Sequence, residues 1–113
     1  MLHFVFYTDS FIPTRFAAIT IGPMVLVRPA YKGDEGLLQH ELTHVKQFWH
    51  NPLFFVLYAI SKTARFNYEV EAYRVQLKYY PDDRTDIFAD FLVNDYRLGI
   101  TNDQAIAALK AVD

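Results

Sequence analysis

Cysteine is absent from this chain. Its absence excludes a disulfide framework and any metal site built on thiolates. A metal ion bound by this protein must therefore be held by histidine, aspartate or glutamate, with water completing the site. The sequence also has no cluster of lysine and arginine, and its formal net charge is −2. Because binding to phosphate backbones requires clustered basic side chains, we expect no nucleic-acid partner.

Long hydrophobic runs are missing as well. The longest, at residues 53–60, is far shorter than the ~20 residues that a membrane-spanning helix requires. The first residues, MLHFVFYTDSF, contain no basic segment, and Thr8 and Asp9 interrupt their apolar stretch. A signal peptide is therefore not expected. These features predict a cytoplasmic protein with no membrane span.

The apolar content is nevertheless high enough to build a core. The chain has 113 residues, of which 52% are hydrophobic and 17% aromatic. This composition argues against disorder, and it fits a single domain that spans residues 1–113.

Segments with strand character come before segments with helical character. Residues 2–8, 16–21 and 24–28 are rich in aromatic and β-branched side chains, and Gly22-Pro23 predicts a tight turn between the last two. The helical patterns lie at about 36–49, 53–64, 66–80, 84–98 and from Thr101 onward. This order predicts an α+β domain with a small antiparallel sheet of about three strands, followed by about five helices.

Two of these expected helices carry further signals. The helix at 53–64 opens with LFFVLYAI, which is apolar on every side. We expect it to lie in the core, and the alternatives are a face for oligomerisation or a contact with a membrane surface. The last helix begins at Thr101, where Gln104 completes a capping box.

The sequence HELTH at residues 40–44 is an HExxH motif. Residues four apart lie on the same face of a helix, so His40 and His44 can converge on one metal ion. Glu41 lies beside them, where it can accept a proton from a water molecule that the metal activates. The alternative is a helix whose histidines have no metal function. The fixed spacing of these three residues within an apolar helical pattern favours the metal site.

A catalytic zinc site usually has three protein ligands. His50 follows His40 by ten residues, which is the spacing found in metzincins. An uninterrupted helix would place the two histidines about 15 Å apart along its axis, too far to share an ion. The chain also has Gln47 where metzincins have a glycine, and both of its methionines lie upstream of the motif. His50 is therefore only an alternative ligand.

Two glutamates of the helix at 66–80 are the other candidates. Glu69 lies at the edge of the apolar stripe that must face the core, whereas Glu71 points almost opposite, toward solvent. We predict Glu69 as the third ligand and keep Glu71 as an alternative. Two histidines and one carboxylate favour Zn²⁺ as the cofactor.

These residues resemble a known family. An HExxH motif followed about 25 residues later by N-x-E-x-E-A-Y resembles the gluzincin metallopeptidases, in size the minigluzincins, and is similar to small zincin-like proteins of bacteria and phages. The resemblance covers about residues 16–80 and implies a zincin-like fold with the HExxH helix under the sheet. It implies zinc ligands at His40, His44 and Glu69, with Glu41 as the catalytic base. Many gluzincins have an aspartate four residues after the third ligand, which orients a histidine, and this chain has Tyr73 there.

A peptidase site also needs an oxyanion donor, support for its metal ligands and a surface that binds the substrate, and the sequence offers candidates for each. Candidate donors to the oxyanion that forms at the substrate carbonyl are Tyr68, Tyr73, Arg74 and His3. Gln47 lies one turn beyond His44 and is a candidate for supporting a ligand. The resemblance also implies a sheet whose edge strand pairs with an extended peptide, and residues 24–28 are the predicted edge. In minimal zincins a C-terminal segment can cover the cleft, and residues 81–113 are the candidate here.

Two functions follow from this pattern. The first is a zinc-dependent endopeptidase that acts on a peptide or protein substrate. The alternative is a catalytically inactive metal-binding module with the same fold, serving interaction or regulation. The small size of the chain and the missing aspartate support the alternative.

Overall fold

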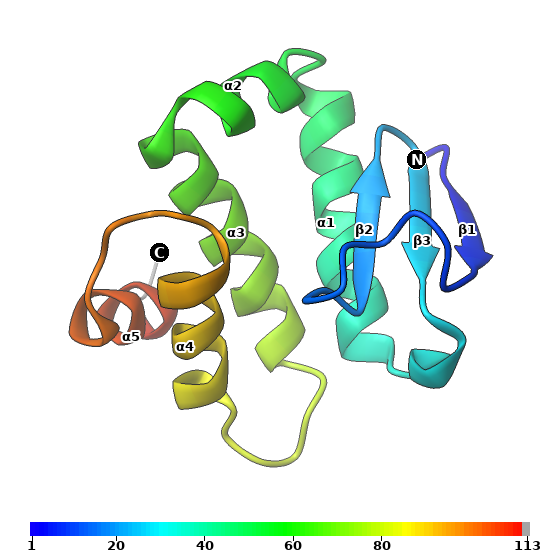
Figure 1. Cartoon of the computed structure of the whole chain (residues 1–113). Helices are drawn as coiled ribbons and strands as arrows, with labels where there is room; N and C mark the ends of the chain where they lie inside the picture. Colours follow the sequence, from blue (N-terminus) through cyan, green and yellow to red (C-terminus); the bar gives the residue numbers. More distant parts are fainter. Residues whose placement is uncertain (112–113) are drawn as a thin grey trace.

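Three short strands form one mixed sheet beside five helices (Figure 1), in a computed structural model that describes residues 1–111. The strands are β1 (Phe4–Tyr7), β2 (Ala18–Ile21) and β3 (Met24–Val27), and their order in the sheet is β1-β3-β2. β2 and β3 form the predicted hairpin, in which Gly22 adopts a positive φ of 59° that suits a glycine. The α+β class is confirmed.

The expectation of an antiparallel sheet is wrong for β1, which pairs with β3 in parallel. Parallel neighbours cannot be joined by a hairpin and need a crossover connection. Here the chain reaches β3 from β1 through residues 8–17 and β2. Arg28 holds the 8–17 segment by donating hydrogen bonds to the carbonyl oxygens of Ile12, Pro13 and Phe16. The predicted edge strand at residues 24–28 is also wrong, because β3 lies in the middle of the sheet.

The helices follow the strands as expected, with several shifted boundaries: the helix expected over 66–80 spans 62–77, and the helix expected over 84–98 ends at Asp95. They are α1 (Glu35–His50), α2 (Phe54–Ile60), α3 (Lys62–Leu77), α4 (Thr85–Asp95) and α5 (Asn102–Lys110), and a 3₁₀ turn at Pro29–Tyr31 precedes them. The helix expected over 53–64 stops at Ile60, because the backbone of Ser61 is extended and its hydroxyl caps α3 by accepting from the Ala64 amide. The capping box of Thr101 and Gln104 is confirmed.

α2 is not the core helix that its composition suggested. Phe54 is its one buried residue, while Val56 is 54% exposed and Ile60 76% exposed. α2 packs chiefly along the start of α3 and spans the end of the molecule between α1 and α3 (Figure 1). Its outer face therefore leaves apolar side chains in contact with solvent.

The core has two parts, and α1 and α3 run side by side between them (Figure 1). A small cluster between the sheet and α1 includes Val25 and Val45. A larger cluster between α3, α4 and α5 includes Phe88 and Leu92. The facing surfaces of α1 and α3 are thus buried on both sides, and polar groups placed there are shielded from water. No helix in residues 1–111 is long and apolar enough to cross a bilayer.

Candidate metal centre

The two histidines of the HExxH motif and Glu69 meet between α1 and α3. The Nε2 atoms of His40 and His44 each lie 3.2 Å from the same oxygen, Oε1 of Glu69. All three residues are buried, and one ligand atom from each lies within 4.8 Å of the others. Ligand atoms bound to one tetrahedral zinc-sized ion lie ~3.4 Å apart. The cluster therefore fits a metal ion with little rearrangement.

Charges within this cluster control its protonation when no metal is bound. Burial alone would lower the pKa of His44, but the charge of Glu69, its hydrogen bond and the charge of Glu41 outweigh burial and raise this pKa to about 9. Burial alone would likewise raise the pKa of Glu69, but both histidines stabilise the carboxylate and hold its pKa well below the ordinary value. In the metal-free protein, a protonated His44 therefore supplies the positive charge beside Glu69 that a metal ion would supply when bound.

Gln47 supports His44, the role for which it was a candidate. Its Oε1 accepts a hydrogen bond of 2.8 Å from Nδ1 of His44, which leaves Nε2 directed at Glu69. The amide group of Gln47 is itself fixed, because its Nε2 donates to the Tyr68 carbonyl at 3.0 Å and to Glu71 Oε1 at 2.7 Å. The ring of His44 is therefore held in one orientation by a chain of hydrogen bonds from α3.

Glu41 is placed beside the cluster rather than within it. Its Oε2 lies 3.6 Å from Nε2 of His40, while its Oε1 accepts a hydrogen bond of 3.0 Å from the Thr20 hydroxyl on β2. The same hydroxyl lies 3.1 Å from the backbone carbonyl oxygen of Glu41. The sheet thus fixes the carboxylate of Glu41 at the side of the candidate metal position. Thr20 has no sequence signal of its own and was not predicted.

Tyr58 of α2 is a second contributor that sequence reasoning missed. Its hydroxyl donates a hydrogen bond of 2.5 Å to Oε2 of Glu69, the oxygen that does not face the histidines. Burial, together with the negative charge of Glu69, raises the pKa of Tyr58 far above its ordinary value, so the phenol stays protonated. Tyr58 therefore fixes the orientation of the carboxylate. Within an apolar helix its side chain gave no sign of this role.

The alternative ligands lie outside the cluster. His50 is exposed at the end of α1, away from the other histidines. Glu71 is exposed on α3 and contributes through its hydrogen bond to Gln47. Among the described residues, the group able to hold a metal ion consists of His40, His44 and Glu69.

The candidate oxyanion donors have different surroundings. The Tyr73 ring packs edge-on against the His40 ring at 4.3 Å, and its hydroxyl lies 2.7 Å from that of Tyr96. The Tyr68 ring packs on Phe54. Arg74 donates to the carbonyl oxygen of Ala111. His3 is exposed near the N-terminus, with Nδ1 3.0 Å from the Met1 carbonyl oxygen.

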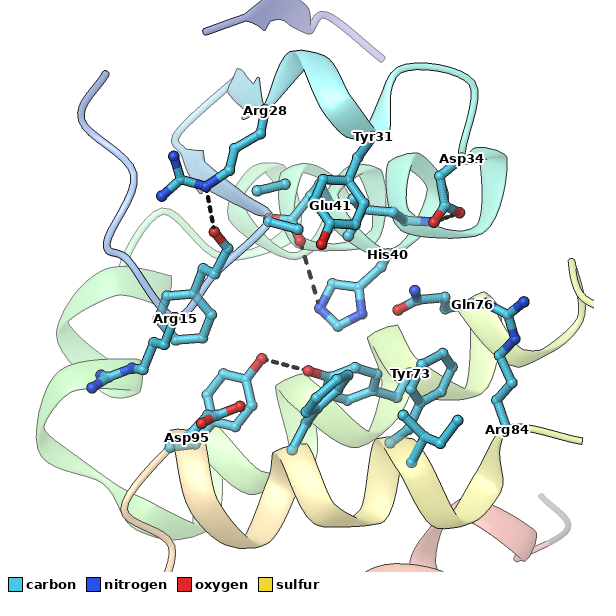
Figure 2. Close-up of a pocket in the computed structure, with 18 of the residues that line it drawn as sticks. Arg15, Arg28, Tyr31, Asp34, His40, Glu41, Tyr73, Gln76, Arg84 and Asp95 are labelled. Atoms are coloured by element: carbon cyan, nitrogen blue, oxygen red, sulfur yellow. Dashed lines mark hydrogen bonds and ion pairs between the residues drawn. The ribbon is translucent and has the colours of Figure 1, made fainter. Parts of the chain in front are cut away.

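Two cavities adjoin the cluster. One of about 440 Å³ is bounded by the 8–17 connection, α1, α3 and α4 (Figure 2). The other, of about 230 Å³, is bounded by β2, α1 and the aromatic side chains of α2. His40, Glu41 and Tyr96 line both cavities, and the smaller one is also lined by His44 and Glu69. α4 forms a wall of the larger cavity, and residues 112–113 of the C-terminal segment expected to cover the site lie outside the described residues.

Comparison with known proteins adds no relationship, since no protein family, curated protein or solved structure matches this chain.

Proposed function

We propose that this protein is a zinc-dependent endopeptidase of the gluzincin type. The observation that carries the proposal is the arrangement of four buried side chains that line the smaller cavity. His40, His44 and Glu69 converge, and Glu41 stands beside them without joining the cluster. Catalytic zinc sites have three protein ligands and a fourth coordination position that is open to water or substrate. Here that position would face the cavity.

Zinc is the metal that this set of donors favours. Two imidazole nitrogens and one carboxylate oxygen suit Zn²⁺, and the absence of cysteine leaves no thiolate to compete. When bound, a zinc ion would act as a Lewis acid that polarises the substrate carbonyl and acidifies water at neutral pH. His40, His44 and Glu69 would hold it.

Glu41 performs the proton transfers in this proposal. Its carboxylate accepts the proton of the attacking water and returns it to the nitrogen of the departing peptide. The hydrogen bond from Thr20 keeps the carboxylate aimed at the cluster during both steps. Tyr96, which lines both cavities and pairs with Tyr73, is a better candidate than Tyr68, Arg74 or His3 for donating to the oxyanion.

The free edge of β2 supports an extended peptide as the substrate. One side of β2 pairs with β3, and no strand within residues 1–111 pairs with its other side. Residues 18–20 of this strand line the smaller cavity, next to the cluster. A substrate chain that pairs with β2 would pass across the candidate metal position. Phe54, Phe55 and Tyr58 line the same cavity, so an apolar side chain beside the cleaved bond is favoured.

The alternative function is a metal-binding module without turnover. The observation that favours it is Tyr73, which stands where many gluzincins have an orienting aspartate and which packs against the His40 ring instead. The two functions differ in what Glu41 does.

Substitution of Glu41 by glutamine separates them. If the protein is a peptidase, the zinc-loaded wild type cleaves members of a quenched peptide library. The Glu41→Gln variant should then lose about 10²–10⁴-fold in rate, because it lacks the general base, while its zinc content stays near that of the wild type. A zinc-loaded wild type that cleaves no peptide in the library, and binds zinc as tightly as the variant, would favour the module without turnover.

A further inference from the structure

The second ring nitrogen of His40 has no hydrogen-bond partner within residues 1–111. Nδ1 of His40 is buried, and the hydrogen bonds of this ring are made at Nε2. The two histidines of the motif differ in this respect, because Nδ1 of His44 is bound to Gln47. When Nε2 of a histidine binds a metal, the ring proton resides on Nδ1 and needs an acceptor. A buried N–H without one would weaken the site.

The residue expected to orient a histidine does not serve this nitrogen. Tyr73, at the position of the gluzincin aspartate, presents its ring to the His40 ring, and its hydroxyl is engaged with Tyr96. An acceptor for Nδ1 must therefore come from another residue.

Gln76, three residues after Tyr73 on α3, offers the matching group. Its Oε1 is the other buried side-chain atom without a partner among the described residues, and the residue is 6% exposed. His40 and Gln76 line the same cavity (Figure 2), in which the amide group of Gln76 is directed toward the His40 ring. An unpaired ring nitrogen and an unpaired amide oxygen thus face the same cavity.

A chain of hydrogen bonds fixes which end of the Gln76 amide faces His40. Nε2 of Gln76 donates to the Tyr80 hydroxyl at 2.9 Å, and that hydroxyl donates to Oδ1 of Asp34 at 2.7 Å. Asp34 is anchored as the N-cap of α1, since Oδ1 also accepts from the Leu37 amide at 3.0 Å. The amide nitrogen is therefore held away from His40, and the oxygen remains available.

Gly36 makes this chain possible. A Cβ atom at this position would lie 2.6 Å from the Tyr80 ring and from its hydroxyl oxygen. The glycine lets Tyr80 approach the first turn of α1 closely enough to reach Asp34. Asp34, Gly36, Tyr80 and Gln76 thus act as one unit that links the start of α1 to the end of α3.

We infer that Gln76 is a positioning residue for the metal centre: its Oε1 accepts the Nδ1–H of His40, directly or through one water molecule, and so directs Nε2 toward the ion. The two histidines are then oriented in the same way, each by a glutamine whose amide nitrogen is bound elsewhere. This inference rests on the metal site of the proposed function, and it does not depend on peptide cleavage.

The test measures the affinity for Co²⁺, a coloured probe for such sites, in the wild type, Gln76→Leu and Gln76→Glu. Loss of a residue that orients a metal ligand typically weakens binding 10–100-fold, and that is the result expected for Gln76→Leu. Gln76→Glu keeps an acceptor oxygen and should retain affinity within a few-fold of the wild type. Gln39→Leu is the matched control, because the side chain of Gln39 donates to Glu35 on the same helix, and this variant should bind Co²⁺ like the wild type.

A second measurement reports on the hydrogen bond itself. In the zinc-loaded wild type, ¹H–¹⁵N spectra should show a slowly exchanging proton on Nδ1 of His40, and in Gln76→Leu this proton should exchange at least tenfold faster. If both variants bind Co²⁺ like the wild type and the Nδ1 proton is equally protected, Gln76 has no positioning role while the metal site stands. If the wild type itself binds neither Co²⁺ nor Zn²⁺, the metal site and this inference both fall.

Discussion

The protonation of His44 offers a quantitative test of the cluster in the metal-free protein. The carboxylate of Glu69 raises the pKa of this imidazole from 6.5 to about 9, against the opposing effect of burial. At pH 7 nearly every molecule should therefore carry the proton. Because a metal requires the lone pair of Nε2, binding at pH 7 should release about one proton, and at pH 9 about half a proton. Affinity should rise about tenfold per pH unit below pH 9 and level off above it.

Isothermal titration calorimetry in buffers with different ionisation enthalpies measures this proton release directly. An NMR titration of the metal-free wild type should place the pKa of His44 near 9. Glu69→Gln removes the negative charge that raises the pKa of His44, while His44 stays buried. The pKa of His44 should therefore fall below 6.5 in this variant. A wild-type pKa near 6.5, or the same pKa in both proteins, would refute this electrostatic account of the site.

The same shifts set the stability of the metal-free protein. The contribution of His44 is complete below pH 6.5 and is lost as pH rises through about 9, because its folded pKa is the higher one. The contribution of Glu69 is complete above pH 4.5 and is lost as pH falls toward its lowered pKa. Thermal unfolding without metal should therefore show the largest effect of this pair between about pH 4.5 and 6.5, and Glu69→Gln should remove that maximum.

Three further substitutions test separate parts of the structure. Thr20→Val removes the hydrogen bond to Glu41. Because one such bond to a charged group is worth ~1.5–3 kcal/mol, kcat should fall by about 10- to 150-fold while the metal content stays unchanged. An unchanged kcat would contradict this. Tyr58→Phe removes the donor to Glu69 and should weaken zinc binding at least tenfold in a chelator competition; equal affinity would deny that role. If the exposed face of α2 mediates oligomerisation, light scattering should give a mass above 13.2 kDa, and Ile60→Glu should restore the monomer, whereas a monomeric wild type would exclude this role.

The features that the sequence predicted well depend on local geometry. The HExxH helix follows from a helical repeat that ends before Asn51-Pro52, and the capping box follows from one side chain and the backbone three residues later. The choice of Glu69 over Glu71 as the candidate ligand also depended on direction around a single helix, and the two residues lie on the sides that this direction predicted.

The features that it missed depend on contacts between distant segments. Whether β1 pairs in parallel is set by the connection of residues 8–17 and its contacts with Arg28, which leave no local pattern. Composition suggested a buried α2, but its place at the end of the molecule leaves Ile60 exposed. Thr20 and Tyr58 reach the site from other elements, and nothing in their own neighbourhoods indicates this.

The central claim is that His40, His44 and Glu69 hold a metal ion, and the metal content of the purified protein tests it most directly. Elemental analysis after reconstitution with Zn²⁺ should give about one zinc per chain in the wild type. Zinc should be lost or much reduced in Glu69→Ala. Glu71→Ala should keep most of its zinc, because Glu71 is exposed on α3 and hydrogen-bonds to Gln47 rather than lying at the metal position. A wild type that takes up no zinc, or a Glu69→Ala variant that binds zinc as well as the wild type, would contradict the account.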